Sequence, residues 1–175
     1  MALAADRALE RKAGPCGPEF GHAVAPGFRV FRGSLVAVLA DGTLVPAGQT
    51  APAGGGAAVT PVCIIGIARQ AMDNTPTQGV DALHAGANPI WVKTGCYALP
   101  FLPNEPAPTY AQLGQAVYAV DDENVSFQAT GAGGGARLVA GHFVGLDGGT
   151  PFVNVAAPTA FPAMLPAAAT PKTTT

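Results

Sequence analysis

The stretch FRVFRGSLVAVLADGTLVPAG, residues 28–48, decides the fold, because it places short apolar runs on both sides of Asp41-Gly42. An Asp-Gly pair between such runs is a strong short-range signal for a β-hairpin. Glycine and proline together account for 40 of the 175 residues (23 plus 17). This many turn-forming residues disfavours long helices and favours short strands. The stretch and its setting therefore predict an all-β chain.

Further strand-like runs follow along the chain. Residues 62–72, VCIIGIARQAM, are apolar and β-branched, which is typical of a buried strand. Residues 89–101, PIWVKTGCYALPF, are rich in strand-forming types, and residues 138–156 contain two runs around a second Asp-Gly pair. About seven or eight short strands separated by frequent turns are typical of a small β-barrel or a β-sandwich-like domain.

The ends of the chain differ in composition from its middle. We expect residues 28–156 to form the β-rich domain, residues 1–27 an N-terminal arm and linker, and residues 157–175 an extended C-terminal tail that is rich in proline. Residues 1–14 are long enough for two helical turns, but a helix this short is marginal without packing. The charged residues of this segment are Asp6, Arg7, Glu10, Arg11 and Lys12.

The stretch AVYAVDDENVSF, residues 116–127, carries three adjacent acidic side chains, Asp121, Asp122 and Glu123, between two apolar runs. They suit either a metal or acid–base site or the tip of a hairpin. A calcium loop alternates its oxygen ligands and ends on a later glutamate, and that spacing is absent from the sequence. Catalytic carboxylates are normally held in a cleft rather than in a row on a tip. Because Asp and Asn favour turns, we predict a hairpin turn.

Charge and cysteine content exclude other classes of protein. A net charge of −2 provides no basic stripe, so we expect no nucleic-acid partner. No apolar run approaches the ~20 residues of a membrane span, and the first residues lack the apolar core of a secretory signal. Three cysteines without C-x-x-C spacing favour a reduced, cytoplasmic site of synthesis.

No enzyme motif emerges from the remaining residues. The three histidines are widely spaced, and the glycine-rich stretches 53–57 and 131–136 lack the Lys-Ser/Thr of a phosphate loop. A nucleophile–base pair of Cys96 with a histidine is conceivable, but nothing in the sequence brings the two together. We therefore expect no enzyme, no metal and no cofactor.

Six stretches taken together resemble a known family. They are MALAADRALERKAG, FRGSLVAVLADGTLVPAG, GIARQAMDN, IWVKTGCYALPF, LGQAVYAVDDENVSF and LVAGHFVGLDGGTPFVNV. In this order they resemble the head-decoration, or capsid cement, proteins of tailed phages and prophages, over most of residues 1–156. The long Pro/Ala/Thr tail and the Gly/Pro-rich residues 14–27 depart from that family.

The resemblance implies a compact β-rich domain that binds the outside of an assembled major capsid shell in the virion, often as a homotrimer, with an extended arm over neighbouring subunits. We expect the capsid contact in the charged N-terminal segment, at Asp6, Arg7, Glu10, Arg11 and Lys12. Two alternatives remain open. One is a phage tail, baseplate or head-fibre component, and the other is a β-barrel that binds a small ligand or glycan through Trp91 and Tyr97.

Overall fold

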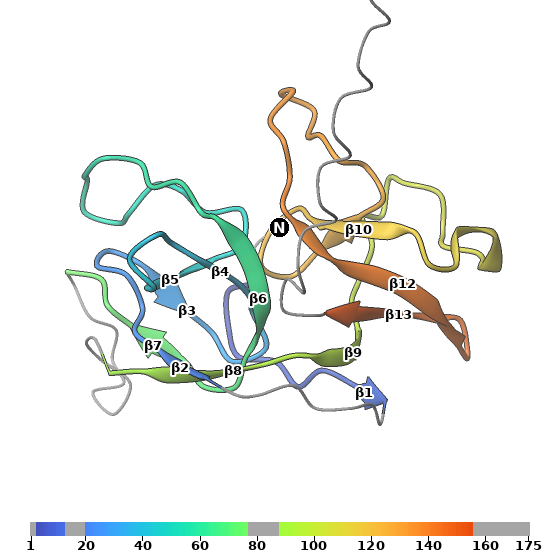
Figure 1. Cartoon of the computed structure of the whole chain (residues 1–175), viewed down its shortest axis with the longest axis horizontal. Coiled ribbons are helices and arrows are strands. Elements are labelled where there is room, and N and C mark those ends of the chain that lie inside the picture. The colour runs from blue at the N-terminus through green and yellow to red at the C-terminus, as the bar shows by residue number, and fades with distance from the viewer. Residues whose placement is uncertain (1–2, 13–19, 77–87, 156–175) are drawn as a thin grey trace, which may run out of the picture.

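The chain is almost entirely β in a computed structural model, which describes residues 3–12, 20–76 and 88–155 (Figure 1). Within these residues the only helical element is a short 3-10 turn, η2 (Tyr110–Gln112). The all-β prediction is confirmed. The strands are β1 (Arg11–Lys12), β2 (Phe20–His22), β3 (Arg29–Val30), β4 (Leu35–Val38), β5 (Leu44–Pro46), β6 (Cys63–Ala68), β7 (Met72–Asp73), β8 (Ile90–Lys93), β9 (Gly95–Ala98), β10 (Ala116–Ala119), β11 (Val125–Ser126), β12 (Val139–Asp147) and β13 (Thr150–Val155).

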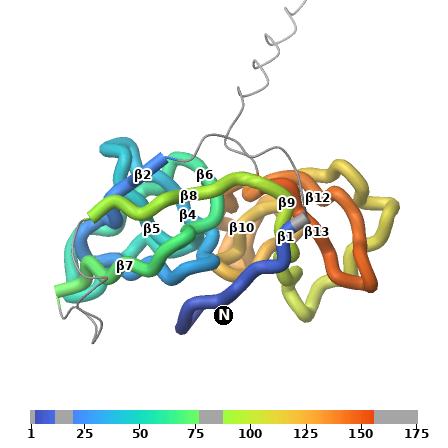
Figure 2. Tube along the Cα trace, turned by 90° about the horizontal axis from the view of Figure 1, so that it is seen from below, coloured from blue at the N-terminus to red at the C-terminus, as the bar shows by residue number. Residues whose placement is uncertain are grey.

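The strands form two larger sheets and one small one. The first has the order β1-β9-β13-β12-β10-β11, the second β2-β8-β6-β4-β5, and β3 pairs with β7. The strands β8 and β9 follow each other almost directly and carry the chain from one large sheet into the other (Figures 1 and 2). Neither sheet closes on itself among the described strands, so of the two predicted architectures the sandwich-like one is observed.

Both predicted Asp-Gly hairpins form. Between β4 and β5, the carboxylate of Asp41 accepts hydrogen bonds from the backbone N–H and the hydroxyl of Thr43, at 2.9 and 2.7 Å. Between β12 and β13, Asp147 pairs with Thr150, and Gly148 and Gly149 have φ of 56° and 86°. Two consecutive residues with positive φ make the two-residue turn whose twist matches that of the flanking strands, and glycine adopts it without strain.

One hydrophobic core joins the two large sheets. Its cluster of buried residues includes Val36 and Ile64 of the second sheet together with Phe143 and Val153 of the first. Beside it the rings of Phe101, Phe127 and Phe143 pack with centroids 4.8 to 6.2 Å apart. Aromatic rings at this spacing pack favourably. The described residues therefore form one domain.

The N-terminal segment differs from the predicted arm. Residues 3–12 are extended rather than helical, and β1 pairs with β9 through Arg11 opposite Tyr97. Further along, β2 pairs with β8, and Val24 and Ala25 are buried in the core. Residues 20–27, predicted as part of the arm and linker, therefore pack against the β-rich domain. Residues 13–19 of the predicted arm and linker and the C-terminal tail 157–175 lie outside the described residues, so the tail stays a prediction.

Close packing of β12 against β13 gives a test of the fold. A Cβ at Gly141 would collide with the backbone carbonyl oxygen of Asn154 on β13. We expect Gly141→Ala to lower the free energy of unfolding by roughly 2 kcal/mol or more, because the backbone cannot move aside cheaply. Gly133→Ala is the matched control, since a Cβ there meets nothing within 4 Å, and urea denaturation measures both. Equal stability of the two variants would contradict this packing.

Candidate functional site

The acidic stretch 121–123 forms the predicted turn between β10 and β11. The Asp121 carboxylate accepts hydrogen bonds from the backbone N–H groups of Glu123 and Asn124, at 2.9 and 2.7 Å. The N–H of Val120 donates to the carbonyl oxygen of Asn124, which closes the turn. The prediction of a turn is confirmed. Burial acts to raise the pKa of Asp121, but the hydrogen bonds that its carboxylate accepts outweigh burial, so the pKa is lowered.

The next residue, Asp122, points inward and is only 1% exposed. One carboxylate oxygen accepts from the backbone N–H of Leu3 at 2.8 Å, and the other accepts from the Ser34 hydroxyl at 2.8 Å. Its backbone carbonyl accepts from the N–H of Leu35. Burial raises the pKa of Asp122, and the nearby charge of Asp121 adds a smaller effect, while the hydrogen bonds act in the opposite direction. This carboxylate joins the turn to β4 and to the N-terminus.

Arg7 makes a second connection of the same kind. Its guanidinium lies 3.5 Å from the Glu123 carboxylate and donates to the Glu123 carbonyl oxygen at 3.2 Å, and its backbone N–H donates to the carbonyl of Arg32. The carboxylate of the neighbouring Asp6 accepts a hydrogen bond from the backbone N–H of Arg32 at 2.9 Å. Burial lowers the pKa of Arg7, and the charge of Glu123 partly offsets this. We call residues 3–12, fixed in this way, the N-terminal strap.

The strap forms one wall of a depression of about 350 Å³ that collects positive charge. We call it the basic depression. Its charged residues come from the strap, the loop before β4, the end of β6 and the end of β8, and they are five of the nine lysines and arginines in the chain. They are Arg7, Arg11, Arg32, Arg69 and Lys93. Tyr97 also lines the depression, with the Arg11 guanidinium 5.9 Å from the centre of its ring.

The predicted contact residues of the strap differ in their exposure to solvent. Asp6 and Glu10 are exposed, whereas Arg7 and Arg11 are half-buried against the domain. Lys12 lies in β1 opposite Cys96. Arg32, Arg69 and Lys93 were not predicted as site residues, because only the folding of distant segments brings them together.

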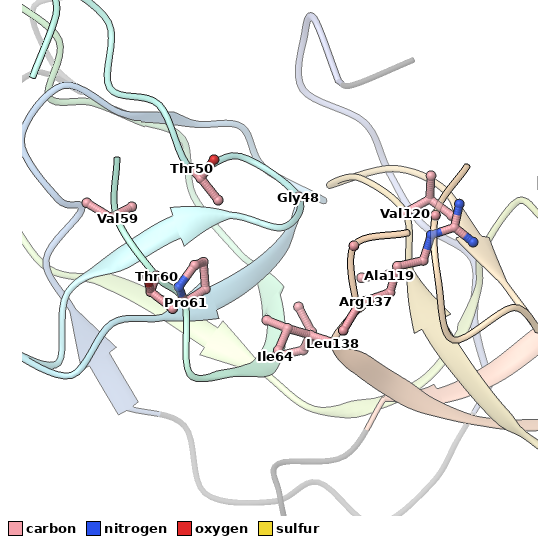
Figure 3. Close-up of a pocket in the computed structure, with 13 residues that line it drawn as sticks. Gly48, Thr50, Val59, Thr60, Pro61, Ile64, Ala119, Val120, Arg137 and Leu138 are labelled. Atoms are coloured by element: carbon pink, nitrogen blue, oxygen red, sulfur yellow. The ribbon is translucent and has the colours of Figure 1, made fainter. Parts of the chain in front are cut away.

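A second hollow of about 470 Å³ lies between the two large sheets (Figure 3). Its walls are mainly small or apolar, such as Val59, Ile64 and Leu138, and the guanidinium of Arg137 stands on one side. That guanidinium donates to the carbonyl oxygen of Gln128 at 3.1 Å. Neither Trp91 nor Tyr97, the aromatic pair of the ligand-binding alternative, lines this hollow. Trp91 is exposed, but Tyr97 is buried, so the two do not form an exposed aromatic platform.

Several large apolar side chains are exposed on the strands and on η2. Two of them, Val139 and Val144, lie on β12, and the Tyr110 hydroxyl of η2 donates to the carbonyl of Leu146 on the same strand. Trp91 is exposed on β8. The complete set among the described residues is Phe20, Val62, Trp91, Tyr110, Leu113, Val139 and Val144.

Of the residues considered for catalysis, Cys96 and His142 lie two strands apart in one sheet, and His84 lies outside the described residues. Across β9, β13 and β12, Cys96 is opposite Asn154, which in turn is opposite His142, so their side chains share one face. Two strand spacings of about 4.8 Å each separate Cys96 from His142, which exceeds the hydrogen-bond reach that a nucleophile and its base need. In the described ranges no group of three or more His, Cys, Asp or Glu side chains is placed to hold a metal ion.

Comparison with known proteins adds no assignment. No family model, no curated protein and no solved structure matches this chain. The resemblance to capsid decoration proteins therefore stays a prediction. In the part of the chain that the structure describes, no helix has the length and apolar character needed to cross a membrane.

Stability should depend on the ionisation of Asp122. Burial holds its pKa above the ordinary value of 3.8, at which the unfolded chain titrates. At a pH between the pKa of the unfolded chain and that of the folded protein, Asp122 is protonated in the folded protein but ionised in the unfolded chain. The free energy of unfolding that Asp122 contributes therefore falls as the pH rises from the first pKa through the second. We expect Asp122→Asn to remove this pH dependence while keeping an acceptor for Leu3. Asp122→Ala leaves two buried donors unsatisfied and should cost about 2 kcal/mol.

Urea denaturation of the three proteins from about pH 4 to about pH 7 measures both effects. Asp41→Asn is the control, because that carboxylate is exposed and belongs to a different turn. A pH slope shared by the wild type and Asp122→Asn would contradict the role of the buried carboxylate. Wild-type stability of Asp122→Ala would contradict it as well.

Proposed function

We propose that this chain is a capsid decoration protein, which binds the outside of the assembled major capsid lattice of a tailed phage and stabilises the head. The observation that carries the proposal is the ordered resemblance of six stretches to that family. Five of them contain all or part of consecutive strands of the chain: β4 and β5, β6 and β7, β8 and β9, β10 and β11, and β12 and β13. The remaining stretch, residues 1–14, contains the N-terminal strap. The stretches thus cover one continuous all-β body.

The composition of the surface favours binding to other proteins. Only 11% of the residues are charged, and large apolar side chains are exposed on rigid elements. Aromatic residues such as Trp91 and Tyr110 are enriched among the residues that dominate protein–protein binding. Val139 and Val144 are also exposed, both on β12. The homotrimer that the family implies would use surface of this kind for contacts between copies, and a monomer mass both free and on shells would contradict the trimer.

The stabilising effect follows from binding only the assembled lattice. A protein that binds the shell but not its separated subunits adds its binding free energy to the stability of the shell. At a free concentration 100 times the Kd, one site contributes about 2.7 kcal/mol. An interface of roughly 800 Å² per partner is of ordinary size. Repeated over a lattice, such contributions raise the temperature at which the shell comes apart.

The strap remains the proposed main contact with the capsid, now as a fixed surface rather than a free arm. Asp6 and Glu10 are exposed on it, and the basic depression lies beside it. Deleting residues 1–27 is not a clean test, because the deletion also removes Val24 and Ala25 from the core. Substitutions of exposed side chains test the contact without this loss.

Addition of the purified chain to emptied, mature heads of the encoding phage tests the proposal. We expect saturable binding and a higher melting temperature of the heads, measured by sedimentation and calorimetry. Heat-unfolded chain added in equal amount is the control for non-specific adsorption. Heads that neither bind the chain nor melt at a higher temperature would contradict the proposal. Location of the chain on tails, baseplates or head fibres by electron microscopy would favour that alternative instead.

A further inference from the structure

We propose that the basic depression, extended by the indole of Trp91, is a docking site for a segment of the partner protein that carries aspartate or glutamate side chains. The inference rests on the proposed function for the identity of the partner, the major capsid protein. It adds the chemistry by which the partner is recognised, which neither the resemblance nor the composition provides.

The basic depression collects positive charge in a chain whose overall net charge is negative. The chain as a whole has a net charge of −2, yet five of its nine lysines and arginines line this one depression. Within the described part of the chain, none of the lining residues is acidic. Arg32 and Arg69 are exposed at its rim, and Lys93 is half-buried. Arg7 is paired with Glu123, but the lining as a whole carries an excess of positive charge, and such a hollow concentrates ligands of the opposite sign and speeds their association.

The site is held rigidly before any ligand binds. The strap is fixed by the Asp122–Leu3 hydrogen bond, by the Arg7–Glu123 ion pair and by pairing of β1 with β9. On the opposite wall the backbone N–H of Arg69 donates to the carbonyl of Trp91 at 2.9 Å, which continues the pairing of β6 with β8. A preorganised site loses little conformational entropy on binding.

Trp91 provides an apolar anchor next to the cations. It precedes Lys93 by two positions on β8, so strand alternation places both side chains on the same face of the sheet. Its neighbour across the strand pair is Gly21 of β2, which has no side chain to cover the indole, and Trp91 is 48% exposed. Tryptophan and arginine are the residue types most enriched at the centres of protein–protein interfaces.

The surroundings of the depression favour carboxylates on a protein over the phosphates of a nucleic acid. Asp6 and Glu10 are exposed on the strap, where they alternate with Arg7 and Arg11. A continuous polyanion lying across the site would meet these like charges, whereas separate carboxylate side chains can avoid them. A volume of about 350 Å³ suits a few side chains rather than a strand of nucleic acid.

The isolated chain provides a direct test, because Trp91 is its single tryptophan and its fluorescence reports on the site. We expect a short peptide in which glutamates are separated by serines to change this fluorescence saturably, with weaker binding at higher salt. The double charge reversal Arg32→Glu and Arg69→Glu should weaken binding by roughly tenfold or more. Arg137→Glu is the charge-matched control, since Arg137 lies at the other hollow, and its binding should match the wild type.

A lack of saturable binding would overturn the inference, and so would equal affinity in the wild type and the double variant. A short DNA duplex that binds the same site more tightly than the peptide would overturn it in favour of a nucleic acid. Circular dichroism confirms that the variants fold.

Binding to phage heads distinguishes failure of this inference from failure of the proposed function. If heads bind the wild type and the double variant equally, the inference fails and the decoration function stands. If the peptide binds but heads do not bind the wild type, the decoration function fails.

Discussion

The buried carboxylate of Asp122 is the constraint on which the arrangement of this domain depends. Removing a carboxylate from water is costly unless hydrogen bonds replace its hydration. Here the replacement comes from Leu3, 119 positions away in the sequence, and from Ser34, 88 positions away. The acidic turn, β4 and the N-terminus are therefore held at one point. The ion pair between Arg7 and Glu123 lies beside it and attaches the N-terminal strap to the acidic turn a second time.

This connection makes a charged terminal segment one wall of the basic depression. Because the strap lies extended along the domain, its cations join those at the ends of β6 and β8 in the basic depression. The two large sheets share one core and are joined by the nearly continuous β8 and β9, so the depression and Trp91 keep a fixed geometry (Figure 2). Such a preorganised surface would suit the proposed binding to a repeating shell, since each copy would present the same contacts.

Local sequence signals predicted the local structure well. The hairpins at Asp41-Gly42 and Asp147-Gly148 and the acidic turn at 121–124 follow from the backbone preferences of Asp, Asn and Gly. The burial of Asp122 could not be predicted, because its partners Leu3 and Ser34 are distant in the sequence and carry no motif. The same holds for the gathering of Arg32, Arg69 and Lys93, which lie on separate elements. The sequence left residues 1–14 as a segment in which a short helix would be marginal, and the pairing of β1 with β9 explains why its described part is extended.

Hydrogen exchange of the N-terminal strap measures whether this segment is part of the folded domain. The structure has the N–H of Leu3 bonded to Asp122, that of Arg7 bonded to Arg32, and that of Ala98 bonded to Glu10 of the strap. If the strap is part of the folded body, these three amides exchange as slowly as those of the neighbouring strands and become exposed together with them. Exchange of Leu3 and Arg7 at the rate of an unstructured peptide, with the core still protected, would contradict the account.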